Sequence, residues 1–307
     1  MRTDTLNRTP FNDRPERLRT HAVGYVHARI SRNRCYPPLC VPILYSKDQL
    51  MNRERVHSPS VFRKTSMMRC SHDFHVNCSN CRLSSICLPL ALDVNEIDQL
   101  DRIIQRSRPL QKGDHLYRQD EEFRSVYAVR SGSVKGYSIT DNGQEQVTGF
   151  FFPGEILGMD GIAKNHHASS ARALETSSVC EIPFDQLGEL SQRMPNLQRH
   201  FFQLMSQEIA ADQQMLTQLS KNTADQRVAT LLLSISARHR RRKLSAANFR
   251  LPMSRTDIGN YLGLTVETVS RVFSRFQKLG VLGVDNKEIA INDPEGLQTM
   301  ANGTDIN

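Results

Sequence analysis

Three cysteines, Cys78, Cys81 and Cys87, lie close together in this 307-residue chain, in the spacing C-x2-C-x5-C. Thiolates this near one another can converge on one metal centre, because the loops between them are too short to hold them apart. A zinc site or iron–sulfur cluster bound only by cysteine needs a fourth thiolate. Cys70, nearby, and Cys180, far along the chain, are both candidates. We therefore predict that this segment is a metal-binding sensor.

Two rival interpretations use the same part of the chain. His72 and His75 precede Cys78 and Cys81 at intervals of three, and both residue types suit zinc. A thiol oxidoreductase would use only Cys78 and Cys81, but no βαβ pattern surrounds them and Cys87 would have no role. An iron–sulfur cluster absorbs visible light and zinc does not, so metal analysis separates the interpretations.

The composition predicts a cytoplasmic protein of about two domains with a tail. No apolar run reaches the roughly 18 residues that a membrane-spanning helix needs. The N-terminus is polar and arginine-rich, without the apolar core of a secretory signal. In the reducing cytoplasm, a tight group of cysteines binds metal or does redox chemistry more often than it forms a structural disulfide.

The positive charge is concentrated in two segments. Residues 1–66 hold 13 Lys and Arg against 5 Asp and Glu, whereas residues 67–307 hold 27 of each kind. Within that balanced part, residues 225–283 hold 11 basic against 3 acidic side chains. Local basic charge of this kind is typical of a nucleic-acid-binding end. Residues 1–69 show no sustained period and are predicted to be a mostly disordered basic extension.

The middle of the chain changes from one helix to short strands. Asp93 is a candidate N-cap for a helix over residues 93–108, where apolar residues recur at helical spacing. From 109 to 184, short apolar runs alternate with glycine-containing turns, which predicts a β-sandwich or β-roll. The expected fold class is therefore α+β.

A long helix is predicted to begin near Pro195, which suits a first helical position. Its apolar residues step by 3, 4 and 7 over about three heptads, which predicts a dimer through paired helices. An aspartate falls on the same seam, where two like charges would meet at a cost of several kcal/mol. The dimer would then be marginal and easily controlled from elsewhere in the chain. The predicted interface comprises Phe201, Met205, Ile209, Asp212 and Leu216.

Residues 254–280 have the pattern of a helix-turn-helix. Ser254 and Asp257 match a capping box that opens a first helix, and Gly263 supplies the tight turn. Thr265 is the N-cap of a second helix, which a glycine closes where a left-handed cap is common. Two short apolar runs beyond that glycine predict a β-hairpin wing.

The second helix, predicted over 266–279, buries an apolar face and exposes polar side chains near its start. Exposed residues at the start of a recognition helix reach base edges in the major groove. Arg271 can donate two hydrogen bonds to guanine, Glu267 can accept one from the cytosine amino group, and Val266 can touch a thymine methyl. We predict that these residues and Ser270 read DNA.

Over roughly three-quarters of its length, the sequence resembles the FNR branch of the cyclic-AMP receptor protein superfamily. The resemblance is carried by Cys78, Cys81 and Cys87, by Cys180 within the stretch VCEIP, and by residues 257–271, DIGNYLGLTVETVSR. It implies a regulator of transcription that senses oxygen, and not an enzyme.

The resemblance implies that Cys78, Cys81, Cys87 and Cys180 bind an oxygen-labile 4Fe–4S cluster, one per subunit. It implies a homodimer that forms without oxygen and binds palindromic DNA of the form TTGAT-N4-ATCAA. Such a regulator activates or represses genes of anaerobic metabolism, with RNA polymerase as a partner. Oxygen would break down the cluster and separate the dimer.

Several other positions match the family. Ile209 and Asp212 match its dimer-helix positions, and Glu267, Ser270 and Arg271 match its base-reading residues. Surface loops also correspond to the family's contacts with RNA polymerase, near Ser131, Thr176 and 139–144.

The sequence departs from the family's pattern in two places. Arg82 directly follows a ligand cysteine, where better-known relatives carry a small residue, so its guanidinium would alter the charge and access around the cluster. Residues 158–169 correspond to the superfamily's phosphate site but lack its arginine. A phosphate would lose its strongest partner there, so we expect no cyclic-nucleotide binding.

These predictions give the chain a definite layout. A cysteine segment and a β-roll, the latter a cupin-like jelly roll of the cyclic-nucleotide-binding type, precede a long dimerisation helix and a winged helix-turn-helix. The predicted bounds are 1–69 for the basic extension, 70–90 for the cysteine segment, 91–192 for the β-roll, 193–221 for the dimerisation helix, 222–297 for the DNA-binding domain and 298–307 for the tail.

Overall fold

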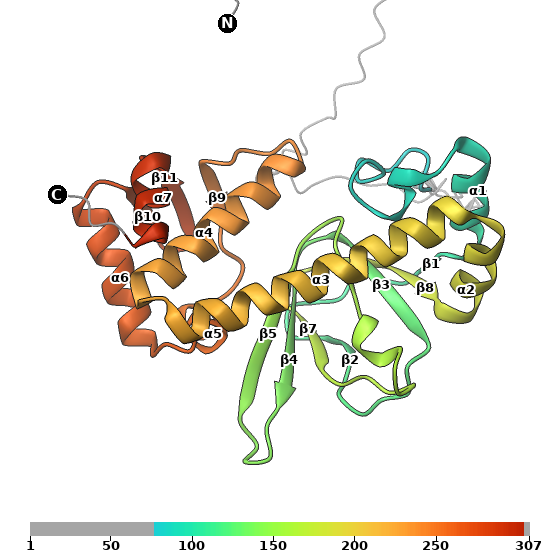
Figure 1. The fold of residues 1–307 in the computed structure, drawn as a ribbon, viewed down its shortest axis with the longest axis horizontal. Coiled ribbons are helices and arrows are strands. Elements are labelled where there is room, and N and C mark those ends of the chain that lie inside the picture. The colour runs from blue at the N-terminus through green and yellow to red at the C-terminus, as the bar shows by residue number, and fades with distance from the viewer. Residues whose placement is uncertain (1–76, 304–307) are drawn as a thin grey trace, which may run out of the picture. The chain divides into compact units, whose positions relative to one another are not determined.

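The computed structural model describes residues 77–303. The predicted basic extension and the candidate ligands Cys70, His72 and His75 lie outside the described residues. Figure 1 shows the order of the elements, from the cysteine segment through a β-roll and a long helix to a C-terminal domain. None of the helices in the described part is long and apolar enough to cross a membrane.

The cysteine segment is a series of turns followed by the 3-10 helix η1 (Leu88–Ala91) and helix α1 (Val94–Ile103). Asp93 caps α1 as predicted, in a capping box with Glu96. The helix ends five residues before the predicted boundary at 108. The reason is tertiary: the chain turns into strand β1 (Gln105–Arg106), which pairs with a strand at the far end of the roll.

Two four-stranded antiparallel sheets form the β-roll, which confirms the predicted α+β class. One sheet has the strand order β1-β8-β3-β6 and the other β2-β7-β4-β5, so β5 is an edge strand. A second 3-10 helix, η2 (Met159–Gly161), lies between β6 and β7. The strands are β2 (His115–Tyr117), β3 (Ser125–Ser131), β4 (Val134–Ile139), β5 (Glu145–Phe151), β6 (Ile156–Leu157), β7 (Ser170–Ala173) and β8 (Ser178–Pro183).

Helices α2 (Phe184–Arg193) and α3 (Pro195–Lys221) follow the last strand of the roll. Pro195 occupies the first turn of α3, as predicted. Leu197 and Phe201 near the start of α3 belong to the same buried core as Leu88 of η1. The start of the long helix is therefore packed directly against the cysteine segment.

Asn222 and Thr223 alone separate α3 from the next helix, α4 (Ala224–Arg241). Arg227 ties this junction together through three backbone carbonyls. Its guanidinium donates one hydrogen bond of 2.9 Å to each of two carbonyls of the junction, those of Leu219 and Asn222, and a third of 2.9 Å to Leu262. The end of α3 is thereby connected to the C-terminal domain.

The C-terminal domain contains the predicted helix-turn-helix. Ser254 caps α5 (Arg255–Leu262) and Thr265 caps α6 (Val266–Lys278) through hydrogen bonds from backbone amides. The two helices approach closely at Gly259, where an added Cβ would lie 2.6 Å from a backbone carbonyl oxygen of the turn. Only glycine fits at that position without moving the turn.

The wing differs from the predicted hairpin in having a third strand. β9 (Asn248–Arg250) pairs with β11 (Glu288–Ile291), which also pairs with β10 (Leu282–Asp285). A last helix, α7 (Pro294–Asn302), extends past the predicted domain end at 297, because it packs against α4.

Candidate cluster site and DNA-reading face

All four predicted ligand cysteines line one small cavity. Cys78, Cys81 and Cys87 come from the turns before η1, and Cys180 comes from the middle of β8. β8 lies between β1 and β3, and this pairing places Cys180 directly across from Arg106 and Ala128. Cys180, one of the two candidates for a fourth ligand, thus lies beside the other three cysteines, whereas Cys70, the other candidate, lies outside the described residues.

A salt bridge anchors the loop that carries the first cysteine. The Asp101 carboxylate accepts a hydrogen bond from the backbone amide of Cys78 at 2.7 Å and one from Arg106 at 2.5 Å. The Arg106 guanidinium lies 4.0 Å from the Cys78 sulfur. Arg130 lines the same cavity. The sequence analysis missed these residues, because only the fold brings them beside the cysteines.

Burial favours the protonated thiol at Cys78, Cys87 and Cys180. It raises the pKa of Cys78 far above its usual range and raises the pKa of Cys87 to about 12. Burial also raises the pKa of Cys180. A thiol oxidoreductase needs the opposite, a cysteine whose pKa is lowered so that the thiolate can attack. A bound metal would have to displace these protons, since the thiolate is the ligand.

The donor set fits a cluster better than a single ion. Among residues 77–303, no three Cys, His, Asp or Glu side chains lie close enough together to hold one metal ion. Four thiols around one cavity suit an iron–sulfur cluster, whose cysteines bind separate irons. The cavity measures about 30 Å³, room for about one or two water molecules. A cluster bound there would be held by the loop over 78–87 and by β8.

The loop that carries three of these cysteines lies directly against the β-roll. Ile86 in the loop rests on Gly154, where an added Cβ would lie 2.7 Å from the Ile86 side chain. Gly154 also has a φ of +93°, which other residues rarely adopt. Arg82, the departure from the family's pattern, is exposed. The cation that lines the cavity is Arg130, and Arg106 lies beside it, 4.0 Å from the Cys78 sulfur.

The predicted dimer seam on α3 is exposed along part of its length and buried at Phe201. Ile209 and Leu216 are 58% and 68% exposed, and Met205 is half-buried. Phe201 is only 7% exposed, because the first turns of α3 face the core of their own subunit. Its neighbour Phe202 is 57% exposed and lies seven residues before Ile209. The outward apolar seam is therefore Phe202, Ile209 and Leu216.

Asp212 lies on the exposed side of α3, between the last two residues of that seam. Partial desolvation raises the pKa of its carboxyl group. Burial, and then the charge of Asp212, raises the pKa of Glu208. Pairing of two such helices would bring these carboxylates together, which agrees with a marginal dimer.

The predicted base-reading residues all lie at the exposed start of α6. Val266 is 38% exposed, and Glu267, Ser270 and Arg271 are exposed. Hydrogen bonding to the helix N-terminus lowers the pKa of Glu267, so the side chain is an ionised acceptor at neutral pH. The other face of α6 is buried in the domain core. These side chains are therefore free to enter a major groove.

A second cavity, of about 510 Å³, lies between the roll and α3 where the superfamily's nucleotide site would be. Asp160, Glu208 and Asp212 are among its lining residues, and within the described chain no Lys or Arg lines it. Asp160 is engaged by the backbone amide and hydroxyl of Ser169, at 2.8 and 2.7 Å. A cyclic phosphate would meet negative charge there.

The fold and the capped, exposed recognition helix define a class, the DNA-binding transcription regulators with a β-roll sensor domain. Residues 107–194 match the cyclic nucleotide-binding domain family, and residues 226–300 match the Crp-like helix-turn-helix domain family. The solved structure of FixK2 from Bradyrhizobium japonicum is similar, with a TM-score of 0.60 and 29% identity over 67% of this chain and 99% of that chain.

Curated relatives make the assignment more specific. The transcriptional activator protein anr of Pseudomonas aeruginosa is 54% identical over 227 residues, 74% of this chain and 93% of the relative. The fumarate and nitrate reduction regulatory protein of Escherichia coli K12 is 49% identical over 229 residues, 75% of this chain and 92% of the relative. The chain belongs to the FNR branch of the CRP/FNR family and is a transcription regulator.

We expect Asp101→Ala to weaken metal binding, because it removes the acceptor that anchors Cys78 and the partner that holds Arg106. Loss of a residue that supports metal ligands costs about 10- to 100-fold in metal affinity. The measurement is iron retained after anaerobic reconstitution and a chelator challenge. Asp98→Ala, which removes an exposed carboxylate from the same helix, is the control and should retain iron like the unaltered protein.

We expect Phe202→Ser to weaken self-association by more than about tenfold, because burying a phenylalanine is worth about 1.5–3 kcal/mol and a dimer buries two. Analytical ultracentrifugation over a concentration series without oxygen measures the effect. Val94→Ser, at a 71% exposed position on α1, is the control. Equal dimerisation of both variants would exclude Phe202 from the interface.

Proposed function

We propose that the protein is an oxygen-responsive transcription regulator that binds one 4Fe–4S cluster per subunit through Cys78, Cys81, Cys87 and Cys180. In the absence of oxygen it forms a homodimer that binds palindromic DNA resembling TTGAT-N4-ATCAA. It activates or represses genes of anaerobic metabolism together with RNA polymerase. The loops expected to contact polymerase, near Ser131, Thr176 and 139–144, are exposed.

One observation carries the proposal: four cysteines, one buried and three half-buried, line a single cavity, and one of them is 93 residues from its nearest partner in the sequence. Buried free cysteines usually act as small apolar residues, and one or two would need no explanation. Four around one cavity, beside two arginines, make a ligand set with compensating positive charge. When bound, a 4Fe–4S cluster supplies an oxygen-labile cross-link between these four cysteines.

The chain connects this site to the dimer helix by a short, packed route. Cys87 directly precedes η1, and Leu88 of η1 is 1% exposed in a core shared with Leu197 and Phe201 of α3. A constraint on residues 78–87 therefore acts on the packing at the start of α3. A few kcal/mol of bias is enough to shift a marginal dimer from mostly separate to mostly paired.

Pairing of two subunits is what makes DNA reading effective. Each subunit would read one half-site with Glu267, Ser270 and Arg271, and a symmetric dimer places two recognition helices in successive major grooves about 34 Å apart. Arg240 and Lys243, which are exposed in the basic run at the end of α4, and other cations of the domain suit the phosphate backbone. Separation of the dimer would leave half-site contacts alone, which hold DNA weakly.

The test is an absorption spectrum, with iron and sulfide assays, of protein purified without oxygen and then exposed to air. We expect a broad band near roughly 400 nm and about four irons per subunit, both lost in air. Cys180→Ser should abolish the band, and the matched variant Cys70→Ser should keep it. A colourless protein with one zinc per subunit, or a cluster lost in Cys70→Ser and kept in Cys180→Ser, would contradict the proposal.

For DNA reading we expect Arg271→Ala to cost about 1–3 kcal/mol of binding to the palindrome and to relax specificity at the guanine. Lys278→Ala, at an exposed position near the end of the same helix, should instead weaken binding to all sequences alike. Fluorescence anisotropy with duplexes substituted at that base pair distinguishes the two patterns.

A further inference from the structure

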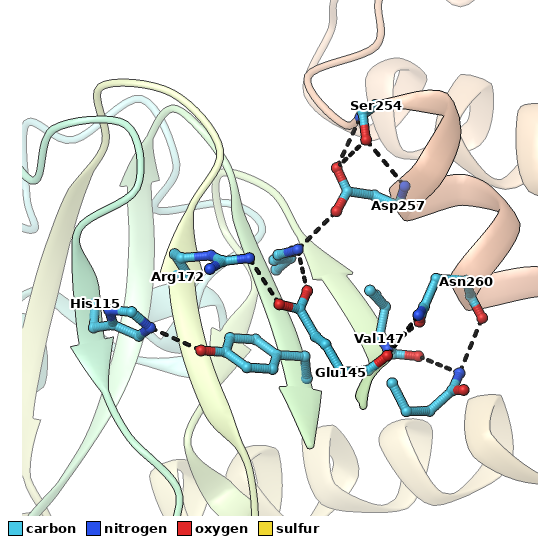
Figure 2. A network of polar contacts seen from close by, with 10 residues as sticks. His115, Glu145, Val147, Arg172, Ser254, Asp257 and Asn260 are labelled. Atoms are coloured by element: carbon cyan, nitrogen blue, oxygen red, sulfur yellow. Dashed lines mark hydrogen bonds and ion pairs between the residues drawn. The ribbon is translucent and has the colours of Figure 1, made fainter. Parts of the chain in front are cut away.

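The side chain of Asn260 attaches the C-terminal domain to the edge of the β-roll. It makes hydrogen bonds of the kind that a neighbouring strand would make. Asn260 on α5 lies beside the outer edge of β5 (Figure 2). Its side-chain oxygen accepts a hydrogen bond from the Val147 amide at 2.5 Å, and its side-chain nitrogen donates one to the Glu145 carbonyl at 2.6 Å. The Gln146 side chain donates back to the Asn260 carbonyl at 3.0 Å. One amide group therefore satisfies edge groups that would otherwise pair with another strand.

A charged group lies beside this contact and is almost completely buried. The Lys135 side chain on β4 is 5% exposed, and its ammonium pairs with Glu145 and, at 2.7 Å, with Asp257 on α5. Arg172 on β7 binds the second oxygen of Glu145 at 2.9 Å. The positive charges of Lys135 and Arg172 thus balance the negative charges of Glu145 and Asp257. Separation of the two domains would remove Asp257 and leave Lys135 with Glu145 alone, so the complete arrangement forms only while the domains are in contact.

Asp257 takes part in two structures at once. One carboxylate oxygen accepts hydrogen bonds from the Ser254 amide and hydroxyl, at 2.9 and 2.6 Å, and completes the capping box of α5. The other oxygen pairs with Lys135. The first turn of the helix-turn-helix is therefore fixed both within its own domain and to the β-roll (Figure 2).

Apolar packing continues the same contact. The rings of Phe150 on β5 and Tyr261 on α5 meet edge to face, with centroids 5.1 Å apart. Val147 and Phe150 belong to the same buried core as Ile258 and Leu262 of α5. The contact takes up the inner side of α5 and leaves the base-reading residues of α6 exposed.

We propose that Lys135, Glu145, Asp257 and Asn260 are positioning residues for DNA recognition. They hold the reading domain against β5 in an orientation that sets the distance and angle between the two recognition helices of a dimer. Through Arg227 the same domain is tied to the end of α3. Arg238 of α4 adds another contact to β5, because it donates a hydrogen bond of 2.7 Å to the Phe150 carbonyl. This inference rests on the proposed binding of a palindrome by a dimer.

The test compares Asn260→Ala and Lys135→Met with the unaltered protein on three duplexes. These are the palindrome with its four-base spacer, the same half-sites with a six-base spacer, and a single half-site. We expect both variants to bind the four-base palindrome about 5- to 150-fold more weakly, the range of energetic coupling between sites in proteins. Discrimination between the two spacers should fall, and binding to the single half-site should not change. A reading domain that had merely unfolded would lose the half-site as well.

The control variant is Arg124→Gln, which removes a cation from an exposed ion pair within the roll, with Glu122. It should behave like the unaltered protein on all three duplexes. Unchanged spacer discrimination in Asn260→Ala would overturn the proposal. Tighter binding of either variant to the palindrome, or binding in air, would also overturn it, because the contact would then hold an inactive arrangement.

Hydrogen exchange provides a readout that does not depend on DNA. The Val147 amide points to Asn260 and not into the sheet, so it should be protected in the unaltered protein and exposed in Asn260→Ala. Fast exchange of this amide in the unaltered protein would mean that the contact does not form in solution. A protected Val147 amide in a protein that fails to bind the palindrome would instead count against the proposed function.

Discussion

The pairing of β8 with β1 and β3 is the interaction on which the cysteine site depends. It carries Cys180 across the roll to the loop of the other three cysteines and sets Arg106 opposite it. Arg106 in turn holds Asp101, which anchors the amide of Cys78. The roll therefore does more than support a loop. Its hydrogen-bond register places Cys180 at the cavity of the other three cysteines, with Arg106 beside them.

Helix α3 lies in two different environments along its length. This difference makes it suitable to transmit a change at the cysteine segment to the exposed apolar seam. Its first turns are core residues of the subunit, and its later turns expose an apolar seam that includes Phe202 and Leu216. Because a helix is rigid, a change in the packing of its first turns also changes the position of the exposed apolar seam on its later turns. Asp212 lies in that exposed part, and pairing of two helices would bring its carboxylate toward a like charge, which opposes strong pairing. Under the proposed function, a small change at the cysteine loop would then decide between separate and paired subunits.

Local signals in the sequence predicted local structure well. The caps at Asp93 and Thr265 form as expected, because a capping side chain and its target amide lie three residues apart. The short strands β1 and β9 could not be predicted, since two or three residues form a strand only when a distant partner is present. Phe201 and Phe202 have the same side chain and neighbouring positions. Only the packing of the first turns of α3 decides which one is buried.

The contact between α5 and β5 shows how a charged surface can specify an orientation that apolar packing alone would leave loose. Phenylalanine and tyrosine rings tolerate sliding, because dispersion changes little with small shifts. The amide of Asn260 and the ammonium of Lys135 do not, since a shift of about 1 Å breaks hydrogen bonds and leaves buried charge unpaired. Burial of Lys135 thus gives up some stability in exchange for one defined arrangement. The proposed reading of two DNA half-sites at a fixed spacing requires one defined arrangement of the domains more than it requires the additional stability.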